Sequence, residues 1–148
     1  MSNLESQCGL QMKVTAIKKI LVHELELRNI TYKVSDKTAV EITAIIEYLV
    51  AEIMELGGNA TRDDKKVRMS IDHVITAIKN DTELNNLYNL NNDIHLNSTD
   101  DAPKLSTWTY KVLRQVHPDT NICSDTKRFI DNLVYNTIKK FSDNFPPN

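Results

Sequence analysis

The sequence predicts an all-α fold, and three observations support this prediction. Its 148 residues include only 3 Gly and 4 Pro, too few for a turn-rich all-β protein. Apolar residues recur every three or four positions in several segments, which is the helical period. Several of these segments begin with Ser or Thr residues of the type that cap helix N-termini.

The first predicted helix spans residues 11–27 and follows a flexible N-terminus over residues 1–10. Its apolar residues are spaced to form one face: Val14, Ile17, Leu21 and Leu25. Residues 28–36 have the composition of a loop with some extended character.

A long helix is predicted over residues 38–63. Thr38 and Glu41 have the spacing of a capping box at its start. Its expected buried stripe consists of Ile42, Ile45, Ile46, Leu49, Ile53, Leu56 and Ala60.

A basic loop over residues 64–69 follows the long helix. Ser70 is then placed to cap a shorter helix that ends near Asn80. A last short helical turn runs through Tyr88. These elements form a first unit over residues 11–90.

The long helix has more apolar surface than its two flanking helices can cover. Because burial of apolar surface drives folding, the stripe needs a second, similar unit. We therefore predict two helical units that pack as a pair, joined by an Asn/Asp-rich linker over residues 91–104.

The second unit is predicted over residues 105–148 and contains only a short and a long helix. Ser106 or Thr107 is placed to cap the first, which Pro118 stops. Ser124 is placed to cap the second. The apolar residues of the two helices are Trp108, Val112, Leu113, Val116, Phe129, Ile130, Leu133, Val134, Ile138 and Phe141.

Composition argues against several classes of function. The chain has 18 Lys and Arg against 20 Asp and Glu, so a net charge of −2 gives no general attraction to nucleic acid. Any DNA contact must come from local basic patches. No segment approaches the roughly 18 uncharged residues of a membrane span, and no signal-peptide run begins the chain.

The residues that could carry out catalysis or bind metals lack the necessary spacing. Cys8 and Cys123 have no metal-binding pattern, and His23, His73 and His95 have no partners at ligand spacing. No nucleophile elbow or phosphate loop occurs. We expect no enzyme activity, no cofactor and no metal.

The centre of the long predicted helix resembles a known family. The stretch EYLVAEIMELGGNA, residues 47–60, is similar to the central helix of the core histone H-two-A. The similarity continues through residues 62–68 and 77–85, and it covers about residues 14–88. The resemblance implies a histone fold, in which two short helices flank a long one.

The second unit resembles the partner histone. The stretch YKVLRQVHPDT, residues 110–120, is similar to the first helix and loop of histone H-two-B. The whole chain thus resembles a histone doublet of the kind found in large DNA viruses. It departs from the family in an extra turn near residues 23–27, in lacking long basic tails, and in a second histone that stops before its second loop.

The resemblance implies DNA contacts through basic loops and helix N-termini, with a cation in the minor groove and no base specificity. Arg68 and Lys33 correspond to the groove-facing cations. The other implied DNA-binding residues are Lys18, Lys19, Lys65, Lys66, Lys111, Arg114, Thr120 and Ser124. The charge pattern alone favours the interpretation that Lys65, Lys66 and Arg68 form a solvated loop and that Lys18 and Lys19 lie on a solvated helix face.

The resemblance also implies an acidic patch that receives arginine side chains of chromatin factors. The corresponding residues are Glu47, Glu52, Glu55, Asp81 and Glu83, with Thr82 in place of a further acid. By spacing alone, these residues are also consistent with solvated helix acids.

His117-Pro118-Asp119 raises one alternative, because the motif also resembles the signature of J-domain co-chaperones. The basic helix of that family is poorly matched, since Lys111 and Arg114 are the only cations of the segment.

The leading hypothesis is a DNA-packaging histone-fold protein of a nucleosome-like particle, located in a nucleus, a viral factory or a virion. Its expected partners are double-stranded DNA, other core histones or histone doublets, and arginine-anchored chromatin factors. No membrane partner is expected. The alternative is a non-packaging histone-fold interaction protein, either a transcription-factor subunit or an acidic histone decoy.

Overall fold

A computed structural model describes residues 9–88 and 102–146, and its described elements are almost entirely helical. The first part contains α2 (Val14–Leu27), α3 (Asp36–Asp63), α4 (Ile71–Asn80) and α5 (Thr82–Tyr88). The second contains α6 (Ser106–Val116) and α7 (Ser124–Asp143). The only described strands, β1 (Arg68–Met69) and β2 (Asn121–Ile122), form a two-stranded parallel pair. The all-α prediction is confirmed.

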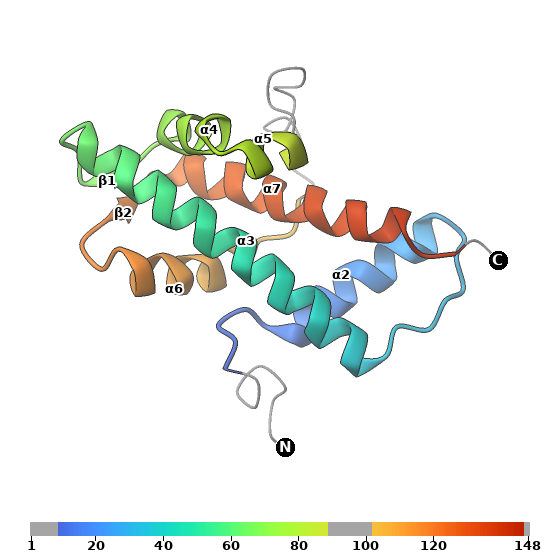
Figure 1. Cartoon of the computed structure of the whole chain (residues 1–148). Helices are drawn as coiled ribbons and strands as arrows, with labels where there is room; N and C mark the ends of the chain where they lie inside the picture. Colours follow the sequence, from blue (N-terminus) through green and yellow to red (C-terminus); the bar gives the residue numbers. More distant parts are fainter. Residues whose placement is uncertain (1–8, 89–101, 147–148) are drawn as a thin grey trace.

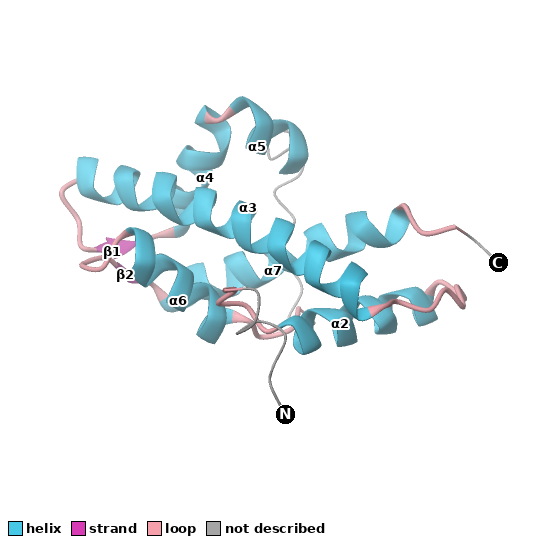
Figure 2. Cartoon of the chain, turned by 60° about the horizontal axis from the view of Figure 1, so that its bottom comes forward, coloured by secondary structure: helices cyan, strands magenta, loops and turns pink. Residues whose placement is uncertain are grey.

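The two long helices cross, and the shorter helices flank the crossing. Figures 1 and 2 show α2 and α6 along one side of α3 and α7, with α4 and α5 along the other. The paired strands lie at one end of the molecule, and the loop between α2 and α3 lies at the other (Figure 1). The side with α2 and α6 therefore contains a helix of each half, whereas α4 and α5 both belong to the first half.

One hydrophobic core serves both halves. Ile53 of α3 and Phe129 of α7 belong to the same cluster of buried side chains, and each is at most 3% exposed. Helix α3 packs against α2, α4, α6 and α7. The second unit thus covers apolar surface that the flanking helices of α3 leave open, as the long stripe predicted.

Polar contacts between the halves reinforce this packing. The Tyr135 hydroxyl donates to Oε2 of the buried Glu24 at 3.1 Å. Arg28 at the end of α2 donates to the Lys139 carbonyl at 3.3 Å and forms an ion pair with Asp143. The hydrogen bond to Asp143 raises the pKa of Arg28. These contacts fasten α2 to the C-terminal part of α7.

Gly58 allows the closest approach between the halves. A Cβ atom at this position would lie 2.1 Å from Cδ2 of His117. The His117 ring donates from Nε2 to the Glu55 carbonyl at 2.9 Å. His117 therefore holds the end of α6 on α3.

A buried carboxylate anchors the beginning of the second unit. Asp131 is 1% exposed, and it accepts from the Leu105 amide at 3.0 Å and from Arg128 at 3.1 Å. Arg128 also donates to the Ala102 carbonyl at 3.4 Å. Burial raises the pKa of Asp131 in spite of these partners.

Helix boundaries match the predictions better than helix caps do. Ser70 caps α4 as expected, and His73 completes the reciprocal bond. The N-cap of α3 is Ser35, whose side chain accepts from the Thr38 amide, so the predicted capping box at Thr38 and Glu41 was wrong. Helix α7 is preceded by Cys123, and Ser124 is its first residue.

Other N-terminal boundaries shifted by a few residues. Helix α2 begins at Val14 rather than at residue 11, and Leu105 precedes α6 without a side-chain cap. Most of the predicted linker 91–104 and N-terminus 1–10 lies outside the described residues, as do Cys8 and His95. The predicted unit boundaries remain predictions.

The predicted stripe on α3 was partly wrong. Ile45 is 47% exposed, whereas Val50, Met54 and Thr61 are buried. The buried face is rotated because α6 and α7 cover one flank of α3 that a lone amphipathic pattern does not reveal.

Candidate nucleic-acid interface

The β1–β2 pair joins two loops that are distant in sequence. The Asn121 amide donates to the Val67 carbonyl at 2.8 Å, and the Cys123 amide donates to the Met69 carbonyl at 3.0 Å. Alternate residues of each strand face opposite sides. Met69 and Ile122 are buried, so their neighbours Arg68 and Asn121 are exposed together.

The turn after α3 orients the lysines beside Arg68. The Lys66 amide donates to the Thr61 carbonyl and the Lys65 amide to the Arg62 carbonyl, which is the Schellman pattern of helix ends. Lys65 adopts the left-handed conformation that this motif needs, with a φ of 58°. Lys65, Lys66 and Arg68 are all exposed.

The second half adds cations around one aromatic ring. The Arg114 guanidinium lies 5.1 Å from the centroid of the Tyr110 ring, and the Lys127 ammonium lies 6.0 Å from it. Tyr110 also donates to Asn121 Oδ1 at 3.5 Å. Arg114 further donates to the Pro118 carbonyl. The aromatic ring thus links α6 and α7 to the strand pair.

Sequence reasoning missed Tyr110 and Lys127. Tyr110 and Arg114 are four residues apart on α6, a spacing that places their side chains together and could have identified the first contact. No local signal joins Lys127 to them, because the contact depends on how α6 and α7 pack.

The remaining predicted residues of this end are Thr120, directly before β2, and Ser124, the first residue of α7. Ser124 is exposed and Thr120 is half-buried. The N-cap residue of α7, Cys123, makes no side-chain capping bond. The positive end of the helix dipole therefore lies beside the cations, partly offset by Asp125 in the first turn.

The structure separates the other predicted DNA residues from this cluster. Lys33 is exposed in the loop at the opposite end of the molecule (Figure 1). Lys18 pairs with Asp36 at 3.0 Å, while Lys19 is exposed on α2. We call the side chains Lys65, Lys66, Arg68, Lys111, Arg114 and Lys127 the basic end.

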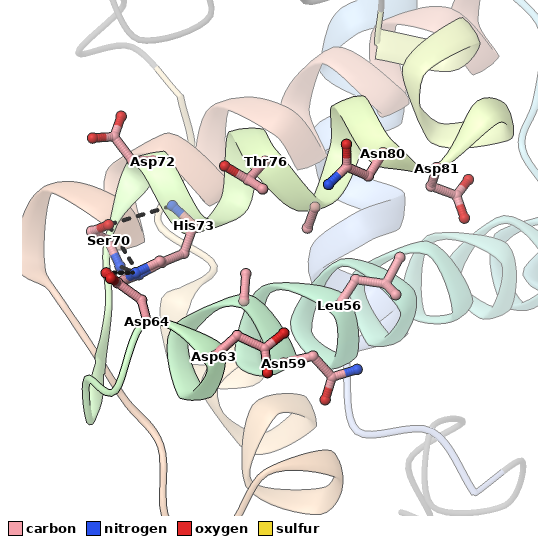
Figure 3. Close-up of a pocket in the computed structure, with 12 residues that line it drawn as sticks. Leu56, Asn59, Asp63, Asp64, Ser70, Asp72, His73, Thr76, Asn80 and Asp81 are labelled. Atoms are coloured by element: carbon pink, nitrogen blue, oxygen red, sulfur yellow. Dashed lines mark hydrogen bonds and ion pairs between the residues drawn. The ribbon is translucent and has the colours of Figure 1, made fainter.

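An acidic groove of about 620 Å³ lies between α3 and α4. Figure 3 shows Asp63, Asp64, Asp72 and Asp81 around it. His73 accepts from the Ser70 amide at 3.0 Å and donates to Asp64 at 2.9 Å, so this histidine does have a carboxylate partner. The histidine acts as a cap residue of α4, and its contact with Asp64 joins it to one carboxylate.

The predicted acidic-patch residues do not share a single environment. Only Asp81 lines the groove, and its side chain also accepts from the Leu84 amide. Glu47 accepts from the amides of residues 11 and 12, both at 2.7 Å, so it holds the segment before α2. Glu52 is half-buried, whereas Glu55 and Glu83 are exposed.

The described residues contain neither a cluster of potential metal ligands nor a membrane-spanning helix. No group of three or more His, Cys, Asp or Glu side chains in residues 9–88 and 102–146 could hold a metal ion. No helix of that part of the chain has both the length and the apolar character needed to cross a bilayer.

Comparison with known proteins finds relatives for about half of the chain. No family model matches. The chain is 40% identical over 82 residues to histone H2AX of Tetrahymena thermophila and 39% identical over 82 residues to histone H2AX of Tetrahymena pyriformis. Each match covers 55% of this chain and 56% of the relative, so the chain spans about half the length of these relatives. Together with the helical architecture, this similarity shows that the chain has an all-α histone fold with a region like histone H-two-A.

Proposed function

We propose that this chain is a DNA-packaging histone-fold protein that contributes to a nucleosome-like particle. It binds the phosphate backbone and the minor groove without base specificity. The observation that supports this proposal best is the β1–β2 pair, in which Arg68 lies opposite Asn121. Asn121 accepts from Tyr110, and the ring of Tyr110 contacts Arg114 and Lys127.

The charges of the basic end are available to an incoming polyanion. No ion pair joins Lys65, Lys66, Arg68, Lys111 or Arg114 to an acid within the described residues. The chain as a whole carries a charge of −2, so this local concentration must provide the attraction. Arg68 is the groove-facing side chain, and the lysines contact the backbone.

A salt titration tests the proposal. The full chain, alone and with complementary core histones, is titrated with a duplex at several salt concentrations. If about six phosphates are neutralised, the slope of log K against log salt is about −5. The Lys66→Ala, Arg68→Ala double variant removes two cations, so the magnitude of this slope decreases by about 2.

A matched control uses Lys79→Ala, because Lys79 is an exposed lysine on α4 outside the basic end. For Lys79→Ala, the slope of log K against log salt stays close to that of the parent chain. Equal effects of Lys79→Ala and Arg68→Ala, or no salt dependence at all, would contradict the proposed interface.

The proposal extends to the acidic residues Glu52, Glu55, Asp81 and Glu83, which form the docking face for arginine-anchored chromatin factors. An arginine-containing nucleosome-binding peptide loses affinity for a Glu52→Lys, Glu55→Lys double variant. Glu26→Lys is the control, because Glu26 is an exposed acid on α2. Unchanged peptide binding by the double variant argues against this face.

A second candidate is a histone-fold interaction protein that binds other histones without packaging DNA. The acidic groove lined by Asp63, Asp64, Asp72 and Asp81 favours it, since such a surface attracts basic proteins. A flat salt response in the DNA titration, combined with tight binding of free histones, identifies this function. The packaging proposal places the protein on chromatin in a nucleus or viral factory, or in a virion.

A further inference from the structure

Helix α2 has apolar residues on two of its sides. The apolar residues of its buried side are Val14, Ile17, Leu21 and Leu25. A second series recurs with spacings of four, three and four residues and consists of Ala16, Ile20, His23 and Leu27. At about 100° per residue, this series is centred about 135° around the helix from the buried side. We call these four residues the outer stripe of α2.

The outer stripe lies at the surface of the molecule. Leu27 is 62% exposed, His23 is also exposed, and Ala16 and Ile20 are half-buried. The buried side of α2 packs against the rest of the core, where α2 contacts α3 and α7. Because apolar surface gains free energy when water leaves it, the outer stripe is suited to a partner.

A groove of about 570 Å³ lies between the outer stripe and α7. Both halves of the chain line it, and its lining residues are Lys19, Ile20, His23, Leu27, Pro103 and Tyr135. The Tyr135 hydroxyl donates to the buried Glu24, which fixes the aromatic ring as one wall of the groove. His23 and Leu27 belong to residues 23–27, where the sequence departs from the family it resembles. The groove is therefore a feature of this chain.

Lysines flank the groove on both sides. Lys19 is exposed on α2, and Lys104 is exposed on the segment before α6. The Lys139 ammonium lies 4.4 Å from the centroid of the Tyr135 ring. No ion pair joins these three lysines to an acid within residues 9–88 and 102–146. Glu26 is an exposed acid beside Leu27, so only the flank near the end of α2 has mixed charge.

We infer that this groove binds one amphipathic helix of a partner polypeptide. Its apolar residues contact the outer stripe, and its acidic residues face Lys19 and Lys139. Ile20 and Leu27 are seven residues apart, which is about 10.5 Å along α2. Two turns of a partner helix have the same length, so apolar residues at positions i, i+4 and i+7 contact both ends of the groove. The apolar lining favours a polypeptide over a nucleic acid, because Ile20 and Leu27 offer nothing that a phosphate can bind.

This inference does not depend on the proposed DNA binding, because it rests on the packing of α2 beside α7 rather than on the basic end. Lys19 belongs to both surfaces, whereas Leu27 is uncharged and belongs to the groove. Variants of Leu27 therefore test the groove without removing a cation.

A labelled helical peptide of about three heptads serves as the probe, with Leu at both seam positions and Glu at the flanking positions. It is titrated into the full-length chain by fluorescence anisotropy. We expect saturable binding that Leu27→Asn weakens by about tenfold or more, because the variant removes an apolar anchor without changing the charge. Val67→Asn is the matched control. It makes the same kind of change at a 71% exposed apolar position before β1 and leaves the affinity unchanged.

A second peptide tests the charge of the partner. It has Lys in place of each flanking Glu, and we expect it to bind about tenfold more weakly. A benzophenone group at one Leu position of the acidic peptide locates the site by photo-crosslinking and mass spectrometry. We expect cross-links to residues 19–27, to Pro103 or to Tyr135.

Four results would overturn the inference. The acidic peptide does not bind, or Leu27→Asn and Val67→Asn bind it equally well. The Lys peptide binds as tightly as the Glu peptide, or the cross-links fall in residues 65–68 or 110–127 of the basic end. The DNA titration separates this inference from the proposed function, because Leu27→Asn keeps the slope of log K against log salt of the parent chain. A changed slope would mean that the groove binds the duplex, which also overturns the inference.

Discussion

The two ends of the molecule contain the same elements but differ in how completely they are covered. At one end the loop after α6 pairs with β1, and α4 and α5 lie over α7. At the other end the loop after α2 has no paired strand within the described residues, and Ile45 and Tyr48 of α3 remain exposed. The difference shows that an amphipathic helix alone does not define which of its residues are buried. The partner segment decides that.

The largest expected difference in unfolding free energy is between alanine variants of Leu133 on α7 and of Ile45, the residue at the equivalent position of α3 when both helices are counted from their first residues. Leu133→Ala removes a 1% exposed side chain and leaves a cavity beneath α4, so we expect a loss of about 3 kcal/mol in unfolding free energy. Ile45→Ala changes the unfolding free energy by less than about 0.5 kcal/mol, because the Ile45 side chain is largely solvated. Urea unfolding followed by circular dichroism measures both. Similar losses for the two variants would show that the exposed face of α3 at Ile45 is covered in the isolated chain.

Gly58→Ala tests the close contact between the halves. The added Cβ would overlap the His117 ring, so we expect destabilisation of about 2 to 3 kcal/mol in the same measurement. Gly57→Ala is the matched control in the same helix, where the added Cβ meets only the flexible Met69 side chain at 3.0 Å. If both alanine variants have equal stability, His117 does not pack on Gly58 in solution.

Asp131 tests the anchor of the second unit. Asp131→Ala leaves the Leu105 amide and Arg128 without their acceptor, so we expect a loss of about 2 kcal/mol. Asp131→Asn keeps an oxygen acceptor and has a smaller effect.

The pH dependence of the Asp131 variants has a defined sign. The folded-state pKa of Asp131 is raised above its ordinary value of 3.8, so folding favours the protonated carboxyl. Its favourable contribution is complete below the unfolded pKa and is lost as pH rises through the folded pKa. The stability of the parent chain relative to Asp131→Asn therefore falls as pH rises from below the ordinary value of 3.8 through the raised folded-state pKa. A relative stability that rises over this range contradicts the buried position of the carboxyl.

The smallest expected effect compares two tyrosines. Burial raises the pKa of Tyr88, and its hydroxyl bonds to Thr137. Tyr88→Phe removes that bond and costs about 1 kcal/mol, whereas Tyr48→Phe on the exposed face of α3 has almost no effect. Thermal unfolding in the isolated chain distinguishes them. A Tyr48→Phe loss as large as that of Tyr88→Phe would mean that the two faces are equally covered.

Much of the candidate site could be predicted from the sequence because its residues lie in one continuous stretch. Lys65, Lys66 and Arg68 follow a helix whose end at Asp63 was predicted, and the resemblance implied DNA contacts for all three. The contribution of Lys127 and Tyr110 could not be predicted, since the two residues are on different helices and meet only through packing. Glu47 was assigned to an acidic surface, yet its carboxylate holds the backbone before α2.

The sequence by itself determined the helices and their order. It also indicated that the long helix, α3 with 28 residues, needs a second unit to cover its apolar surface. Helical periodicity, turn composition and the excess of apolar surface are local properties, so they can be read along the chain. Only the tertiary structure decided which flank of α3 is buried and which cations gather around β1. Those outcomes depend on contacts between residues far apart in sequence, and Ile45 and Leu133 show that equivalent positions of two similar helices reach opposite environments.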